Sequence, residues 1–140
     1  MSEINFDQEF NKIGVHKVMT KGVITASPNN KFSQVFQFFS DHNINHIPVC
    51  ENGVLLGIIS NKDMMHQLYR HIVVEKNSNV AELDQKIKLV DIMTKNPVTV
   101  DANATLQEVR DLFYKVPFNC LPVVFEGKLV GVFTPKDFVK

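Results

Sequence analysis

Residues 47–63 read IPVCENGVLLGIISNKD, and a related string, LPVVFEGKLVGVFTPKD, stands 74 positions later at residues 121–137. The two strings share a Pro-Val pair, two glycines and a closing Lys-Asp pair at the same spacing. The same offset pairs Val18-Met19-Thr20-Lys21 with Ile92-Met93-Thr94-Lys95. Because two copies are too few for an open repeat array, the duplication predicts a pseudo-symmetric pair that shares one core.

Each copy begins with the same predicted order of a strand and a helix. A short extended piece, residues 22–25 or 97–100, precedes a polar turn. Apolar residues at helical spacing then predict a helix in both copies, and they are Phe32, Val35, Phe36 and Phe39, and Leu106, Val109, Leu112 and Phe113. Thr105 and Glu108 form a capping box at the start of the second of these helices, where the first copy has Lys31.

A hairpin and a second helix complete each predicted copy. Two short apolar runs flank a tight turn at Gly53 and again at Gly127, which is typical of a β-hairpin. A further helix is expected to start at Asn61, and its apolar face comprises Met64, Met65, Leu68, Tyr69 and Ile72. Its counterpart barely begins before Lys140. We expect His66 and the Tyr69-Arg70-His71 string to be exposed or to face a second chain.

The fold class expected from this order is α+β, with two β-α-β-β-α repeats packed sheet to sheet. A sheet of about three strands with helices on one side cannot bury its other face alone, so the copies must pack together. The predicted domains are an N-terminal helix or arm over 1–14, repeat 1 over 15–72, a polar linker over 73–88 and repeat 2 over 89–140. In the arm, we expect Ile4, Phe10 and Ile13 to point inward.

Composition narrows the class of protein. The 140 residues suit one compact domain, and 44% apolar residues with 11 Phe supply its core. The 15 basic and 15 acidic residues cancel, which excludes the charge expected of a dedicated nucleic-acid or membrane-surface binder. No transmembrane span or signal peptide is recognisable, so we expect a cytoplasmic protein. Cys50 and Cys120 are expected to be buried reduced thiols.

The repeated strings resemble a tandem pair of cystathionine-beta-synthase (CBS) domains, a Bateman module. The resemblance rests on the Met-Thr strings at the head of each copy, the Pro-Val strings entering each hairpin, and the Gly-to-Lys-Asp strings closing it. It covers residues 15–140. It implies a regulatory module that binds an adenosine-containing ligand, AMP, ADP, ATP or S-adenosylmethionine, in clefts between the repeats. It also implies a homodimer and an effector protein that the sequence does not name.

The ligand-binding residues implied by this resemblance fall in two Ser/Thr-x-x-Asp motifs. Ribose and phosphate recognition transfers to Ser60, Asp63, Thr134 and Asp137. The resemblance also implies an adenine wall and a phosphate contact formed by Val23, Ile24, Val98, His46, Ile47 and Leu121. A ribose diol offers two donors, and one ionised carboxylate can accept both. The same motifs are also helix-capping patterns, which every such helix needs with or without a ligand.

The phosphate contacts expected of the two copies differ. His46 precedes the first Pro-Val string and can pair with a phosphate, more strongly when protonated, whereas Cys120 stands at the same place in the second copy and carries no charge. Lys62 and Lys136 are either solvated lysines or phosphate contacts.

Other functions have weaker support in the sequence. His42 and His46 have zinc-ligand spacing, but Pro48 disfavours one helix through both, so no metal site is predicted. No phosphate loop or activated nucleophile is recognisable, so neither catalysis nor a required cofactor is predicted. The remaining alternative is a ligand-free dimerisation or interaction module.

Overall fold

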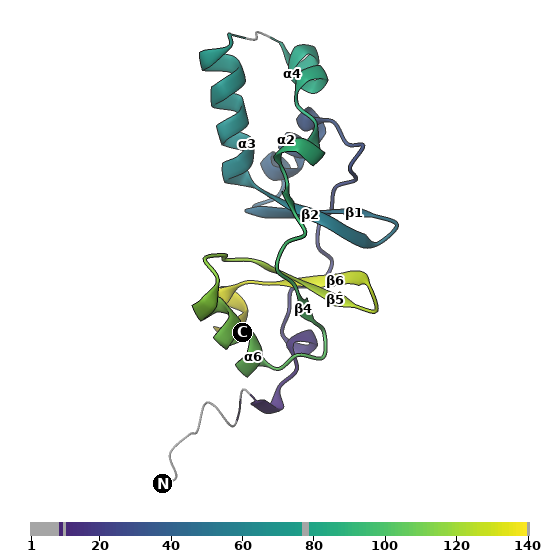
Figure 1. Ribbon diagram of the computed structural model, residues 1–140, viewed down its shortest axis with the longest axis vertical. Coiled ribbons are helices and arrows are strands. Elements are labelled where there is room, and N and C mark those ends of the chain that lie inside the picture. The colour runs from purple at the N-terminus through teal and green to yellow at the C-terminus, as the bar shows by residue number, and fades with distance from the viewer. Residues whose placement is uncertain (1–8, 10, 77–78, 140) are drawn as a thin grey trace. The chain divides into compact units, whose positions relative to one another are not determined.

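The structure is a computed structural model that describes residues 9, 11–76 and 79–139. Its contacts divide the chain into two units (Figure 1). The central unit is Ile24–Pro97, and the flanking unit combines parts of Met1–Val23 and Val98–Lys140. Helices and two three-stranded sheets make up the described part of the chain, which confirms the α+β class.

The central unit contains one sheet of order β1-β2-β3, in which both pairings are antiparallel. Its elements are α2 (Phe32–Asp41), β1 (His46–Glu51), β2 (Val54–Ser60), α3 (Asn61–Leu68), the π-helix η2 (Tyr69–Val74), α4 (Val80–Lys86), α5 (Leu89–Ile92) and β3 (Thr94–Lys95). The side chain of Asp84 on α4 accepts hydrogen bonds from the amide and hydroxyl of Ser33 at 2.8 and 2.6 Å, which fixes α4 against the start of α2.

The flanking unit contains a sheet of order β4-β5-β6, parallel between β4 and β5 and antiparallel between β5 and β6. Its elements are the 3-10 helix η1 (Val15–Lys17), β4 (Val100–Asp101), α6 (Leu106–Lys115), β5 (Leu121–Phe125), β6 (Lys128–Phe133) and the 3-10 helix η3 (Pro135–Val139). The predicted capping box is present, because Thr105 accepts from the Glu108 amide at 3.2 Å and Glu108 accepts from the Thr105 amide at 3.4 Å.

Both predicted hairpins are confirmed. The turn between β1 and β2 has Asn52 and Gly53 at φ values of 53° and 81°, and the turn between β5 and β6 has Glu126 and Gly127 at 52° and 80°. Two successive positive φ values give the turn whose twist matches antiparallel strands.

Each unit has its own hydrophobic core. Phe32 and Val35 of α2 are buried in the central unit, and Leu106 and Val109 of α6 are buried in the flanking unit. The predicted helical stripes therefore face their cores. The core of each unit also includes a residue from the head of the other copy, Leu89 in the central unit and Val15 in the flanking unit.

The head segment of each copy thus packs on the other copy. The Val15 amide donates to the Ala104 carbonyl at 2.8 Å, and Thr20 exchanges two backbone hydrogen bonds with Val132 at 2.9 and 3.0 Å. At the equivalent place in the central unit, Thr94 pairs with Ile58. The division into arm, two repeats and linker stays a prediction, since contacts group the chain by unit instead.

Two glycines at the repeat spacing permit this close approach. A Cβ on Gly131 would lie 2.7 Å from the Thr20 carbonyl oxygen, and one on Gly57 would lie 2.7 Å from the Thr94 carbonyl oxygen. Both distances are far below normal contact, so a larger residue would push the head segment off the sheet.

The predicted strands at 22–25 and 97–100 are wrong in their positions. Residues 22–25 have no strand assignment, and only an isolated parallel bridge joins Ala26 to Val49. Strand β4 begins at Val100, at the end of the predicted stretch. In both copies the sheet is reached one or more residues later than the apolar pattern indicates.

The stretch predicted as a polar linker contains helical structure. The helix continues as η2 to Val74, and α4 occupies Val80–Lys86. Asn79 caps α4 by accepting from the Glu82 amide at 2.9 Å, which explains how a polar stretch forms a helix here. The expected inward residues Ile4 and Phe10 lie outside the described residues, whereas Ile13 packs against the flanking core.

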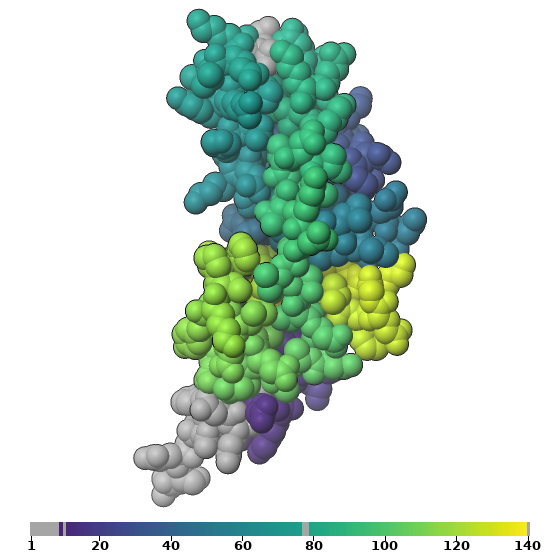
Figure 2. All heavy atoms as spheres, in the orientation of Figure 1, coloured from purple at the N-terminus to yellow at the C-terminus, as the bar shows by residue number. Residues whose placement is uncertain are grey.

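The predicted apolar face of α3 is only partly buried. Met64 is buried and Leu68 packs on the core, but Met65, Tyr69 and Ile72 are 45%, 61% and 47% exposed. The α3–η2 segment stands at the molecular surface (Figure 2). His71, expected to be exposed or to face a second chain, is instead buried, and its Nδ1 lies 3.0 Å from a carboxylate oxygen of Glu75.

Candidate functional site

The first Ser/Thr-x-x-Asp motif joins β2 to α3. The Ser60 hydroxyl accepts from the Asp63 amide at 3.1 Å, and Asp63 Oδ2 accepts from the Ser60 amide at 2.9 Å. These reciprocal bonds form the capping box that starts α3. No described residue donates to Asp63 Oδ1, and Asp63 is half-buried. The carboxylate therefore keeps an acceptor oxygen for a donor outside the protein.

The second motif joins β6 to η3 and is differently arranged. Asp137 Oδ2 accepts from the Thr134 amide at 2.9 Å, as in the first motif. Asp137 Oδ1, however, accepts from the hydroxyl of Thr20 at 3.0 Å. Asp137 is only 2% exposed. Both carboxylate oxygens at this motif are thus engaged within the flanking unit.

The residue beside each carboxylate also differs. Burial lowers the pKa of His46 below its ordinary value, although the charge of Asp63 offsets part of this effect. His46 is therefore mainly neutral near pH 7 and offers a phosphate an N–H group rather than a full charge. Burial, together with the charge of Asp137, raises the pKa of Cys120 to about 12. Cys120 is a neutral thiol at any physiological pH.

The amides at the start of α3 are largely engaged. The Asn61 amide donates to the Asn45 carbonyl at 2.9 Å, and the Asp63 amide donates to Ser60. A helix start attracts anions through its unpaired amides, so this one has less to offer a phosphate than an open helix end. The side chains of Lys62 and Lys136 are exposed.

The residues predicted to form an adenine wall fall into two groups. Ile47 and Leu121 are completely buried in the cores of their units, so what they can present to a ligand is backbone. Val23, Ile24 and Val98 are half-buried. Their role in ligand binding stays a prediction.

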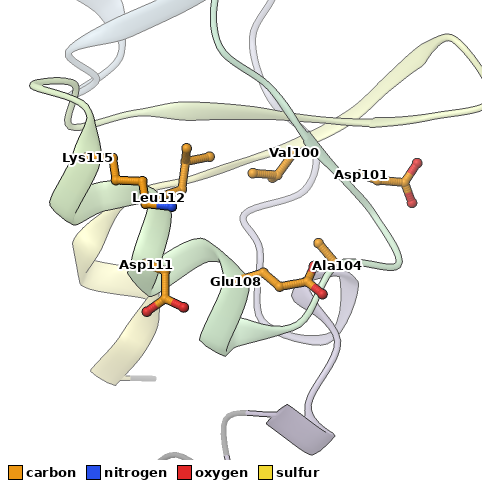
Figure 3. A pocket seen from close by; sticks show the side chains of 7 residues that line it. All are labelled: Val100, Asp101, Ala104, Glu108, Asp111, Leu112 and Lys115. Carbon is orange, nitrogen blue, oxygen red and sulfur yellow. The ribbon is translucent and has the colours of Figure 1, made fainter.

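A pocket of about 430 Å³ lies in the flanking unit, and its lining residues are labelled in Figure 3. Val100, Ala104 and Leu112 give it an apolar wall, and its charged lining residues are Asp101, Glu108, Asp111 and Lys115. Three carboxylates and one ammonium group disfavour a phosphorylated ligand. None of the predicted binding residues lines this pocket.

The residues weighed for other chemistry are separated. Helix α2 ends at Asp41, with His42 as its C-cap, and His46 opens β1, so the two histidines do not share a helix face. Among residues 9, 11–76 and 79–139, no three His, Cys, Asp or Glu side chains are grouped as metal ligands. No helix in these ranges is long and apolar enough to cross a bilayer.

Sequence reasoning gave Thr20 no functional role, although it belongs to the repeated Met-Thr string. The signal was the presence of a hydroxyl at the same place, Thr20 and Thr94, in both copies. The exchange of head segments, which the sequence does not reveal, brings Thr20 to Asp137.

Comparison with known families supports the symmetry of these motifs. The CBS domain model matches residues 15–70 and again 89–140, which together are most of the chain. The chain belongs to the CBS domain family. It carries two CBS domains, and one Ser/Thr-x-x-Asp motif lies within each match.

The relatives of this CBS pair include an enzyme that it matches only in part. It is 31% identical over 118 residues to the inosine-5'-monophosphate dehydrogenase of Korarchaeum cryptofilum, which covers 84% of this chain and 22% of that protein. Because the chain spans well under half of this relative, the match does not extend to the whole enzyme.

Two solved CBS structures were obtained with adenosine-containing ligands. The structure of CBSX2 from Arabidopsis thaliana in complex with AMP has a TM-score of 0.74 and 21% identity, covering 91% of this chain and 93% of that one. The CBS domain pair of protein MJ0100, in complex with 5'-methylthioadenosine and S-adenosyl-L-methionine, has a TM-score of 0.68 and 26% identity, covering 90% and 96%.

Proposed function

We propose that this CBS pair is a non-enzymatic regulatory module that binds an adenosine-containing ligand through its Ser/Thr-x-x-Asp motifs. The observation that carries the proposal is the carboxylate of Asp63, which is held by Ser60 and retains an acceptor oxygen that no described residue occupies. A ribose 2',3'-diol supplies two donors at a spacing that one carboxylate can accept. AMP in CBSX2 and S-adenosyl-L-methionine in MJ0100 support this ligand class.

The ribose rather than the phosphate is expected to dominate recognition. His46 is mainly neutral near pH 7, and two of the amides at the start of α3 are engaged within the protein. Lys62 and Lys136 are exposed, so their attraction for a phosphate is screened by salt. AMP, ADP, ATP and S-adenosylmethionine share the diol and therefore remain the candidate ligands.

Isothermal titration tests the proposal with AMP, ATP and S-adenosylmethionine. We expect Asp63→Asn to weaken binding at least tenfold. The side-chain carbonyl oxygen of Asn can still accept from the Ser60 backbone amide, but it has no charge to offer the diol. The ligand control is 2',3'-dideoxy-AMP, which lacks both hydroxyls and should bind no better to wild type than AMP binds to Asp63→Asn. Lys62→Ala is the protein control at an exposed neighbour. Equal heats for AMP and its dideoxy analogue would refute the proposal.

A second candidate function is a ligand-free interaction module. The exposed apolar side chains of the α3–η2 segment favour it, and they are Met65, Tyr69, Ile72, Val73 and Val74. An apolar strip of this kind is a frequent feature of surfaces that pair two chains. Light scattering over a range of protein concentrations tests it, and a constant monomer mass would exclude self-association. A thermal-shift screen separates the two functions, because only the first predicts stabilisation by adenosine ligands.

A further inference from the structure

The two motifs are related by the repeat but are not equally available. In the first motif, Asp63 Oδ1 has no described donor and is available to a ligand hydroxyl. In the second, Asp137 Oδ1 already accepts the Thr20 hydroxyl at 3.0 Å, and the residue is almost completely buried. Because Asp137 is only 2% exposed, a ribose hydroxyl approaching Oδ1 must compete with the Thr20 hydroxyl, a donor of the same kind.

The backbone holds Thr20 in place for this contact. Thr20 exchanges two hydrogen bonds with Val132 on β6, and Asp137 lies in η3, which follows β6 directly. Gly131 leaves room for the Thr20 carbonyl, where a Cβ would come within 2.7 Å. The hydroxyl is thus carried by a backbone that an isolated antiparallel bridge fixes on β6, and holding it costs little further entropy.

The equivalent threonine makes no such bond. Thr94 pairs with Ile58 at the same offset, yet within the described part of the chain its hydroxyl donates nothing to Asp63. The neighbouring residues also differ, because His46, with an N–H group to offer, stands beside Asp63, and the thiol of Cys120 stands beside Asp137. The sequence motif is therefore duplicated, but only Asp63 keeps a carboxylate oxygen without a described donor.

We propose that Thr20 is an intramolecular latch on Asp137, a specificity-determining contact that makes the Asp63 motif the primary ribose site and holds the Asp137 motif closed. The inference rests on the proposed function, since it assigns the order in which the two motifs bind the diol. A diol that binds at Asp137 competes with the Thr20 hydroxyl for a buried oxygen, so the second motif binds more weakly.

The experiment isolates the second motif with Asp63→Asn and then removes the latch. Titrated with AMP, the double variant Asp63→Asn/Thr20→Val should bind at least tenfold more tightly than Asp63→Asn alone, a difference of about 1.4 kcal/mol. In the same Asp63→Asn background, Thr20→Ser keeps the hydroxyl, so its AMP affinity should equal that of Asp63→Asn alone. The matched control is Thr94→Val in the Asp137→Asn background, where AMP affinity should not change.

A readout without ligand checks the latch itself. The Thr134 amide donates to the same carboxylate, so its NMR resonance should move in Thr20→Val and stay in Thr20→Ser. The Ser60 amide should stay in Thr94→Val. An unmoved Thr134 resonance, or equal AMP affinity with and without the Thr20 hydroxyl, overturns the latch while leaving the proposed function intact. If wild type binds none of AMP, ATP and S-adenosylmethionine, the proposed function is overturned, and the binding order falls with it.

Discussion

Gly131 provides the most direct test of how the head segment is held on β6. A Cβ at this position would lie 2.7 Å from the Thr20 carbonyl oxygen and 2.8 Å from the sulfur of Met19. The thioether can rotate away, but the carbonyl is fixed by the two hydrogen bonds between Thr20 and Val132. Gly131→Ala therefore forces a backbone displacement.

The cost of Gly131→Ala is bounded by two routes. If the pairing holds, the added methyl group is an overpacking strain of about 1–3 kcal/mol. If the head segment moves off, two hydrogen bonds of about 0.5–1.5 kcal/mol each are lost. The two routes give similar values, so we expect the free energy of unfolding to fall by about 2 kcal/mol.

Urea unfolding followed by circular dichroism measures this loss, and amide hydrogen exchange locates it. The amides of Thr20 and Val132 should lose protection beyond the global change. Gly127→Ala is the control, because nothing lies within 4 Å of its Cβ and its cost of about 1–2 kcal/mol comes from a φ of +80° alone. It should leave the Thr20–Val132 pairing protected. A loss below about 0.5 kcal/mol in Gly131→Ala, with both amides protected, would refute the reasoning.

Three further predictions concern single side chains. Burial lowers the pKa of His46 below 6.5, so the unfolded chain binds a proton at this residue more readily than the folded chain does. The free energy of unfolding should therefore fall as the pH drops from 7.5 through the folded pKa. Thermal melts should show a smaller fall in His46→Gln, and equal falls in the two proteins would contradict this. With its pKa raised to about 12, Cys120 should resist a disulfide reagent in the native protein at pH 7.5. The pKa of Cys50 is also raised, but its side chain is partly exposed, so Cys50 should react first. The early phase of the reaction should be lost in Cys50→Ser, and its persistence would count against this assignment. Met64→Ala should lower the free energy of unfolding by about 2–5 kcal/mol, and Met65→Ala by less than about 1 kcal/mol, because Met64 is fully buried and Met65 is 45% exposed. Urea unfolding measures both values. Similar losses would disprove the burial assigned to α3.

Much of the fold was predictable because its signals are local. The apolar spacing of Phe32 and Val35 predicts α2, and the glycine turn at Gly53 predicts the first hairpin, since each depends on residues close in sequence. The helix inside the linker was not predicted, although Asn79 caps it, because Asp84 anchors α4 to α2. The cap partner Glu82 is three residues from Asn79, but Ser33, the partner of Asp84, is 51 positions away, and most helical stability comes from such tertiary contacts.

The candidate site likewise has a part that the sequence predicts and a part that only the structure shows. Its motif residues Ser60 and Asp63 are recognisable because a capping box and a ribose-binding carboxylate use the same short spacing. The repeat alone predicts that Asp137 behaves as Asp63 does. The structure separates them, because the Thr20 hydroxyl reaches Asp137 across 117 positions of sequence.

The sequence by itself determined the duplication, the order of most elements and the identity of the two acidic motifs, because these follow from periodicity and from residues a few positions apart. Only the tertiary structure decided which copy each head segment packs on, and that the Thr20 hydroxyl bonds to Asp137. The physical reason is that a hydrogen bond depends on distance in space. Near-equivalent sequences such as those around Thr20 and Thr94 therefore acquire different partners once the chain has folded.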